Sequence, residues 1–226
     1  MAEIAGRPFL ERLIEHLAAY GFQRFVLCTG HKADSVEAHF RTRQSPYEVA
    51  FSREHVPLGT AGGLRHARNL LPGDPILVLN GDSFCPVDYP ALLGAHRSRG
   101  SAATLAVVAA DDTAEYGQVL FSDDGTVTAF REKLHSSGAG WINAGVYVFR
   151  HATLAALPDR SPLSLEKDVF PALVGKGLHA WKTRGPLLDI GTPERYLRAQ
   201  TELASLMRSS ARIRLDAASD APGSSR

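Results

Sequence analysis

Short apolar runs alternate with helix-like segments along the first half of this 226-residue chain. The run Ile76–Leu79 is bounded by Pro75 and Gly81, which makes it too short for a helix and typical of a buried parallel strand. The pattern predicts helices at Pro8–Tyr20, Ala33–Phe40, Thr60–Leu70 and Tyr89–Arg99, and strands at Phe25–Cys28, Tyr47–Phe51 and Ile76–Leu79. This order favours an open, doubly wound, mainly parallel α/β sheet of Rossmann-like organisation, with ligands at the carboxyl ends of its strands.

The second half of the chain has more antiparallel signals. Strands are predicted at Ala103–Val108, Gln118–Phe121, Val127–Phe130 and Val146–Phe149, then at Leu178–Trp181 and Leu187–Ile190. Short helices are predicted at Ala152–Leu157 and Leu165–Leu173, and a longer one from Pro193 to Met207 with Thr192 as its cap. Residues 209–226 have no apolar period and are expected to be disordered, which leaves 1–208 as a single domain.

The balance of charges limits the possible partners. With 25 Lys and Arg against 24 Asp and Glu, the net charge of +1 favours neither nucleic acid nor an anionic membrane. Cys28 and Cys85 lie in apolar surroundings without a CxxC neighbour, and we interpret them as buried free thiols of a reducing compartment. No apolar run is long enough to cross a bilayer and no signal-peptide pattern is present, so we expect a soluble, cytoplasmic protein.

Small residues are concentrated in Pro57-Leu58-Gly59-Thr60-Ala61-Gly62-Gly63, between a predicted strand and a predicted helix. Such a segment can leave backbone N–H groups open to a ligand at a helix N-terminus. It can equally be a plain turn from strand to helix, since it matches neither the GxGxxG nor the GxxxxGK[ST] pattern. The residues alone leave both interpretations open.

Two aspartates end predicted strands. Asp82 follows the run that ends at Leu79, and Asp189 ends the run that begins at Leu187. Each alone is more often a helix cap or a loop residue. Together they could converge on one metal ion, and Mg²⁺ usually takes one or two carboxylates from the protein while phosphates and water supply its other ligands.

Polar residues in the second half are less specific. Glu132 and Lys133 carry opposite charges after a predicted strand, and a solvated ion pair is the plain alternative to a binding role. Asn143 lies between apolar residues, where its amide suits either a turn or a hydrogen bond to a ligand hydroxyl.

Taken in order, these segments resemble the motifs of the sugar-1-phosphate nucleotidyltransferase family. The motifs are Pro57-Leu58-Gly59-Thr60-Ala61-Gly62-Gly63, Leu79-Asn80-Gly81-Asp82, Glu115-Tyr116-Gly117, Phe130-Arg131-Glu132-Lys133, Ile142-Asn143-Ala144-Gly145-Val146-Tyr147 and Asp189-Ile190-Gly191-Thr192-Pro193-Glu194. They extend over nearly the whole chain. The resemblance implies the family's α/β fold, with an antiparallel portion that binds the sugar.

The resemblance also implies substrates and site residues. It is greatest to the guanylyltransferases of heptose 1-phosphate and next to those of mannose 1-phosphate, so we expect GTP and a sugar 1-phosphate as substrates and a nucleotide sugar for surface polysaccharide synthesis as product. The implied catalytic residues are Asp82, Lys133 and Asp189, with Mg²⁺ on the two aspartates. The implied nucleotide-binding residues are Leu58, Gly59, Thr60 and Gly62, and the implied sugar-binding residues are Gly117, Glu132 and Asn143. A homo-oligomer is possible.

The front of the chain departs from the family pattern. Family members begin with an apolar strand, a GGxGTR-type triphosphate loop and a lysine, whereas this sequence opens at Met1-Ala2-Glu3-Ile4-Ala5-Gly6-Arg7-Pro8. We interpret this as an N-terminal truncation that removes the first strand. Because that strand usually lies near the centre of a doubly wound sheet, we expect a gap between the Phe25–Cys28 and Ile76–Leu79 strands.

Two other functions remain open from the sequence. A catalytically inactive regulatory or assembly subunit of the same fold would keep the sugar pocket without the triphosphate loop. A glycosyltransferase that consumes a nucleotide sugar would also use an α/β sheet and a metal ion, but the Asp-x-Asp strand end usual in that class is absent from the sequence.

Overall fold

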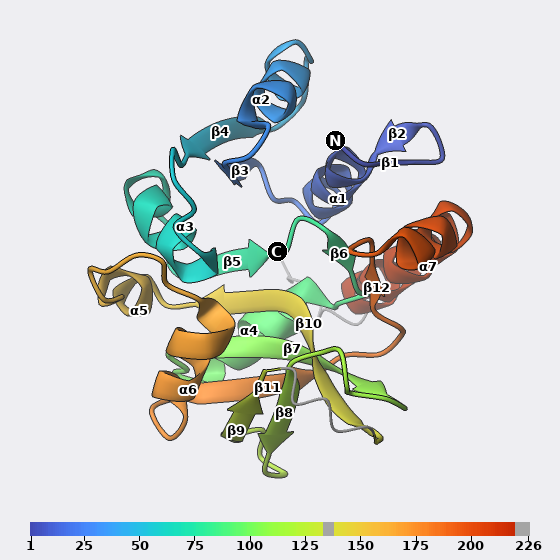
Figure 1. Ribbon diagram of the computed structural model, residues 1–226. Helices are drawn as coiled ribbons and strands as arrows, with labels where there is room; N and C mark the ends of the chain where they lie inside the picture. The colour runs from blue at the N-terminus through green and yellow to red at the C-terminus, as the bar shows by residue number, and fades with distance from the viewer. Residues whose placement is uncertain (133–137, 220–226) are drawn as a thin grey trace, which may run out of the picture.

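The computed structural model describes residues 1–132 and 138–219, with side chains as far as residue 211. The first half contains β1 (Glu3–Ile4), β2 (Arg7–Pro8), α1 (Phe9–Ala18), β3 (Arg24–Thr29), α2 (Ala33–Arg41), β4 (Glu48–Arg53), α3 (Thr60–Ala67), the 3₁₀ turn η1 (Arg68–Leu70), β5 (Ile76–Leu79), β6 (Ser83–Phe84) and α4 (Tyr89–Arg99). The second half contains β7 (Ala103–Ala110), β8 (Gln118–Phe121), β9 (Val127–Arg131), β10 (Gly140–Phe149), α5 (His151–Ala155), the π-helical turn η2 (Leu165–Val169), α6 (Phe170–Leu173), β11 (Leu178–Lys182), β12 (Leu188–Asp189) and α7 (Pro193–Ser219). Figure 1 shows their arrangement.

The largest sheet has six strands and is built around β10. Its order is β11-β7-β10-β8-β9, and β5 also pairs with β10. β7 and β11 are parallel, whereas the pairings of β10 with β5, β7 and β8 are antiparallel. The predicted α/β class with an antiparallel portion is confirmed, but the prediction that β5 is a buried parallel strand is wrong, because β5 pairs antiparallel with β10 and is largely half-buried.

Helices cover both faces of this sheet because side chains along a strand alternate between its faces. On one face, Tyr147 and Phe149 of β10 pack with Phe170 of α6. On the other face, Val146 and Val148 of β10 belong to a cluster that includes Tyr89 and Leu92 of α4. Burying each such large side chain stabilises the fold by roughly 1.5–3 kcal/mol.

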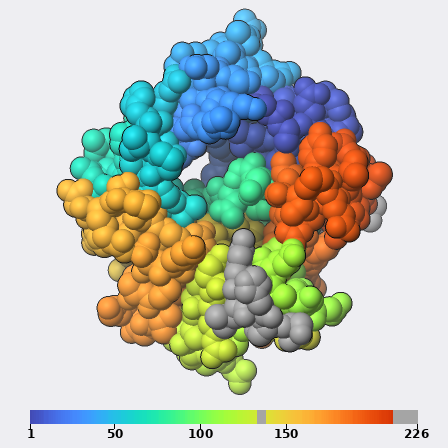
Figure 2. Space-filling model, viewed as in Figure 1, coloured from blue at the N-terminus to red at the C-terminus, as the bar shows by residue number. Residues whose placement is uncertain are grey.

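The strands β3 and β4 form a separate parallel pair. In the described part of the chain, the second edge of β3 and the second edge of β5 have no strand partner, and the two strands lie in different sheets as predicted. Figure 2 shows an opening in the surface between the blue and cyan N-terminal segments and the green segment that follows β5. Cys28 of β3 is exposed, so its predicted burial is wrong, whereas Cys85 is buried as predicted.

The last helix is longer than the sequence pattern predicts. α7 continues through Ser219, so residues 209–219 are helical rather than disordered. Ser210 is fully buried and its backbone carbonyl accepts a hydrogen bond of 2.9 Å from the hydroxyl of Tyr20 in the turn after α1. Its own hydroxyl lies 3.2 Å from Nε2 of His16. Contacts made by a small polar residue, which no apolar period can reveal, therefore tie this helix to α1.

Candidate active site

Asp82 and Asp189 come together because two short strands pair. β6 follows Asp82 directly and is antiparallel to β12, with Asp189 opposite Ser83. The backbone N–H of Ile190 donates to the carbonyl oxygen of Asp82 at 3.0 Å. Asp82 is accessible at the surface, yet partial desolvation by the surrounding protein and then the charge of Asp189 raise the pKa of its carboxyl group. The two strand ends that carry Asp82 and Asp189 therefore lie side by side, and their convergence on a metal ion stays a prediction.

Both oxygens of the Asp189 carboxylate accept hydrogen bonds. The hydroxyl of Tyr116 donates to Oδ2 at 3.1 Å, and the backbone N–H of Gly191 donates to Oδ1 at 3.1 Å. Nη1 of Arg195, in the first turn of α7, also contacts Oδ1, at 3.3 Å. Arg195 forms a second ion pair with Glu115, and its guanidinium carbon lies 4.9 Å from the centroid of the Tyr116 ring. Tyr116 belongs to one of the sequence motifs and Arg195 directly follows another, but neither side chain was predicted to contact Asp189.

The three predicted sugar-binding residues also lie together. A Cβ atom added to Gly117 would lie 2.9 Å from Oε2 of Glu132 and 2.9 Å from the ring of Phe130, so the carboxylate of Glu132 packs against the bare backbone of Gly117. The backbone N–H of Asn143 donates to the carbonyl oxygen of Gly117 at 2.8 Å. Tyr116, which hydrogen-bonds Asp189, directly precedes Gly117 in the chain. The three predicted sugar-binding residues are therefore connected to Asp189 through Tyr116.

The amide of Asn143 makes the local hydrogen bond of a turn and also contacts a buried tyrosine. Its Oδ1 accepts from the backbone N–H of Gly145 at 3.0 Å, and its Nδ2 donates to the hydroxyl of the fully buried Tyr147 at 2.8 Å. β10 bulges here, and Gly145 has φ +70° with its Cα close to Ser83 and Asn80. A side chain at Gly145 would meet Ser83 Oγ at 2.7 Å, so glycine is required where β10 passes the loop that carries Asp82.

At the start of α3, two backbone N–H groups of the glycine-containing segment are bonded within the protein and are not open to a ligand. The backbone N–H groups of Ala61 and Gly62 donate to the carbonyl oxygen of Leu163 at 2.9 and 3.0 Å. Gly59 has φ +79°, and a Cβ atom there would lie 2.5 Å from the same oxygen. Of the two interpretations that the sequence left open, the one with N–H groups free for a ligand does not hold at Ala61 and Gly62, because another segment of the chain already uses them.

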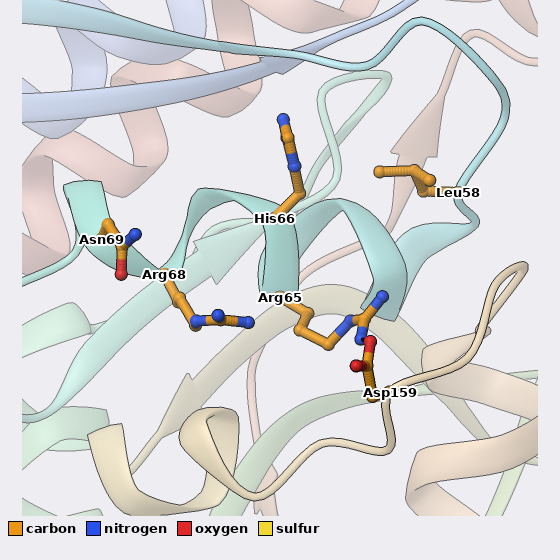
Figure 3. Close-up of a pocket in the computed structure, with 6 residues that line it drawn as sticks. All are labelled: Leu58, Arg65, His66, Arg68, Asn69 and Asp159. Atoms are coloured by element: carbon orange, nitrogen blue, oxygen red, sulfur yellow. Dashed lines mark hydrogen bonds and ion pairs between the residues drawn. The ribbon is translucent and has the colours of Figure 1, made fainter.

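Leu58, from the same segment, lines a pocket of about 360 Å³ with Arg65, His66, Arg68, Asn69 and Asp159. Figure 3 shows Arg65 reaching from α3 toward Asp159 while His66 points to the opposite side of the helix. In Figure 1, α3 lies on the left of the molecule and α7 on the right, with β5 between them. In this view α3, which contains Thr60 and Gly62, and β12, which contains Asp189, therefore lie on opposite sides of β5.

The donor set fits Mg²⁺. Among the residues that the structure describes, no group of three or more His, Cys, Asp or Glu side chains could hold a metal ion. Two adjacent carboxylates nevertheless suit Mg²⁺, which prefers hard oxygen ligands and usually takes only one or two from the protein. Lys133, the remaining predicted catalytic residue, lies outside the described residues.

A family model described as nucleotidyl transferase matches residues 1–205. The chain belongs to the nucleotidyl transferase family. The mannose-1-phosphate guanylyltransferase catalytic subunit beta of Drosophila pseudoobscura pseudoobscura is 33% identical over 202 residues, which is 87% of this chain and 54% of the relative. The mannose-1-phosphate guanylyltransferase of Mycobacterium tuberculosis is 33% identical over 207 residues, which is 90% of this chain and 58% of the relative. The chain thus spans a little over half the length of these relatives.

Solved structures give a second comparison. HddC from Yersinia pseudotuberculosis, crystallised with GMP-PN, resembles this chain with a TM-score of 0.78 and 30% identity, covering 90% of this chain and 88% of that one. A second crystal structure of HddC matches with the same TM-score and 31% identity. Within the residues that the structure describes, no helix has the length and apolar character needed to cross a membrane.

Proposed function

We propose that this chain transfers a nucleotidyl group from a nucleoside triphosphate to a sugar 1-phosphate, giving a nucleotide sugar and pyrophosphate in the cytoplasm. The observation that carries the proposal is the convergence of Asp82 and Asp189 next to Gly117, Glu132 and Asn143, with Tyr116 joining the two groups. A pair of carboxylates can hold a cation between two phosphorylated substrates.

In the proposed reaction, an oxygen of the sugar phosphate forms a bond to the α-phosphorus of the triphosphate. The bond from that phosphorus to the bridging oxygen of the β-phosphate breaks, and pyrophosphate leaves with the electron pair. The protein accelerates such a displacement mainly by positioning the reactants and by neutralising charge. Mg²⁺ held by Asp82 and Asp189 would supply Lewis-acid stabilisation of the phosphate oxygens.

We assign the sugar to the region around Gly117. Glu132 and Asn143 flank this glycine, and their carboxylate and amide suit hydrogen bonds to hydroxyl groups of a sugar. Lys133, next to Glu132, would bind the phosphate of the sugar. Leu58 and the exposed backbone of Gly59 and Thr60 would contact the nucleotide from the α3 side, with Gly62 holding that segment against Leu163.

For the substrates we propose GTP with heptose 1-phosphate or mannose 1-phosphate. Mannose-1-phosphate guanylyltransferases among the relatives and the GMP-PN complex of HddC support the guanylyl assignment. The test is pyrophosphate release with each common triphosphate against several sugar 1-phosphates. Preference for UTP, dTTP, CTP or ATP would overturn the guanylyl assignment, and binding of a nucleotide sugar without pyrophosphate release from any pair would favour the inactive-subunit alternative.

A further inference from the structure

We propose that Arg195 acts as an internal counter-ion in the candidate metal site. Its guanidinium pairs with Asp189 before a divalent cation binds, and it releases Oδ1 of Asp189 when the cation arrives. The proposal rests on the proposed function, because it takes Asp82 and Asp189 as the metal ligands. It predicts that the protein without nucleotide binds divalent cations weakly, so that the metal enters together with the triphosphate.

Arg195 contacts two carboxylates at unequal distances. Its Nη2 forms the closer ion pair, with Glu115, whereas Nη1 lies 3.3 Å from Oδ1 of Asp189. Charge-assisted N–H···O bonds are usually about 2.7–2.9 Å long, so the contact with Asp189 is the weaker one. Stacking on the ring of Tyr116 supports the guanidinium independently of either carboxylate. Arg195 can therefore leave Asp189 while it stays anchored on Glu115 and Tyr116.

The arrangement around Asp189 defines what an arriving cation must displace. Oδ2 accepts the hydroxyl of Tyr116, and Oδ1 accepts the backbone N–H of Gly191 in addition to Arg195. Of these donors, only Arg195 carries a positive charge. A cation that binds Oδ1 would be repelled by this guanidinium and would compete with it for the same oxygen.

The competition has a predictable size. Two like unit charges several ångströms apart at a protein surface repel by on the order of 1 kcal/mol, so neutralising Arg195 should strengthen cation binding about fivefold to tenfold. Phosphates of a bound triphosphate would offset the repulsion, because they add negative charge and further oxygen ligands. The effect of the substitution should therefore be largest in the absence of nucleotide.

The test measures Mn²⁺ binding to the nucleotide-free chain by electron paramagnetic resonance for wild type, Arg195→Gln and Arg198→Gln. Arg198 is the matched control, because it lies on the same helix and also interacts electrostatically with Asp189, but it hydrogen-bonds Glu202 instead. We expect Arg195→Gln to bind Mn²⁺ about fivefold to tenfold more tightly than wild type, and Arg198→Gln to differ by less than about twofold. Unchanged or weaker Mn²⁺ binding by Arg195→Gln would overturn the proposal, as would an equal gain in both variants.

A measurement on the wild-type chain covers the case in which Arg195→Gln does not fold. In protein labelled with ¹⁵N-arginine, the Nε resonance of Arg195, assigned by its loss in Arg195→Lys, should shift when Mg²⁺ is added. A resonance that stays unchanged at saturating Mg²⁺ would show that Arg195 does not yield. If Asp189→Asn leaves Mn²⁺ binding intact, the metal assignment in the proposed function fails. If Asp189→Asn abolishes Mn²⁺ binding but Arg195→Gln has no effect on it, only the counter-ion role is refuted.

Discussion

At the scale of single residues, the site depends on contacts that join the aspartate pair to the predicted sugar-binding residues. The sequence motifs identified Asp82, Asp189, Gly117 and Glu132, and the structure brings each pair together. Tyr116 belongs to one of these motifs, but its hydrogen bond to Asp189 was not predicted. A tyrosine beside a glycine carries no signal of its own, because its partner is 73 residues away in sequence.

Replacement of either aspartate by asparagine should remove the charge that the metal needs. We expect Asp82→Asn and Asp189→Asn each to lower kcat by about two orders of magnitude or more, because electrostatic stabilisation of the transition state is usually the largest single contribution to catalysis. Binding of the nucleotide sugar should fall less. The measurement is pyrophosphate release at saturating substrates, and near-normal turnover of both variants at saturating Mg²⁺ would refute the assignment.

Tyr116→Phe should test the link between the sugar region and Asp189. The substitution removes a hydrogen bond to a carboxylate, a type of bond worth about 1.5–3 kcal/mol, so kcat/KM for the sugar phosphate should fall about tenfold or more. Tyr196→Phe is the control, because the hydroxyl of Tyr196 donates to the backbone carbonyl of Glu3 at 2.6 Å and does not contact Asp189. Equal activity of Tyr116→Phe and wild type would show that Asp189 needs no such support.

At the scale of elements, most helices and strands could be predicted from apolar spacing and capping residues. α4 and β8 have the predicted bounds, and β3, α2, β4 and β11 differ from theirs by one or two residues. The hairpin of β1 and β2 and the strand β6 were not predicted, because two-residue strands have no periodicity to detect. The orientation of β5 was also not predictable from its apolar run, since parallel and antiparallel buried strands have similar composition.

The segment that begins α3 illustrates a motif whose local role the sequence left open. Its glycines could leave N–H groups open or form a plain turn, and in the structure Gly59 and Gly62 allow close packing against the backbone of Leu163. A single sequence could not distinguish a ligand from another part of the chain as the partner of these N–H groups. The segment is therefore fixed by the fold before any nucleotide binds.

Gly59→Ala should therefore destabilise the protein. The residue has φ +79° and its added methyl group would meet Leu163 O at 2.5 Å, so the free energy of unfolding should fall by about 2 kcal/mol or more. Gly94→Ala in α4 is the control, because a Cβ atom there would meet nothing within 4 Å and alanine should raise helix stability by about 0.5–1 kcal/mol. Urea unfolding of both variants is the measurement, and equal stability of the two would contradict this role of Gly59.

At the scale of the whole molecule, the described strands fall into one six-stranded sheet and three two-stranded sheets, of which the β3–β4 pair is parallel. The large sheet is covered by helices on both faces, whereas β3 is mostly half-buried or exposed and pairs along one edge. The family resemblance predicted a gap between β3 and β5, and these two strands lie in different sheets. Apolar periodicity alone could not have done so, because it does not report which strands are neighbours.

The separation should be visible in hydrogen exchange. Amides of β3 and β4 should exchange about tenfold or more faster than those of β7 and β10, because local opening of a two-stranded pair with few buried contacts costs less free energy. Exchange can be followed by mass spectrometry of peptides from these strands. Equal protection of the two groups would mean that β3 and β4 unfold only together with the large sheet.

The central claim, that this chain makes a nucleotide sugar, is tested most directly by following the α-phosphate of GTP. The chain is incubated with Mg²⁺, GTP labelled at the α-phosphorus, and mannose 1-phosphate or heptose 1-phosphate. We predict that the label moves into a nucleotide sugar only when the sugar 1-phosphate is present, with one pyrophosphate released for each product molecule. Label that remains in GTP with both sugars, or that is released as GMP whether or not sugar phosphate is added, would contradict the account.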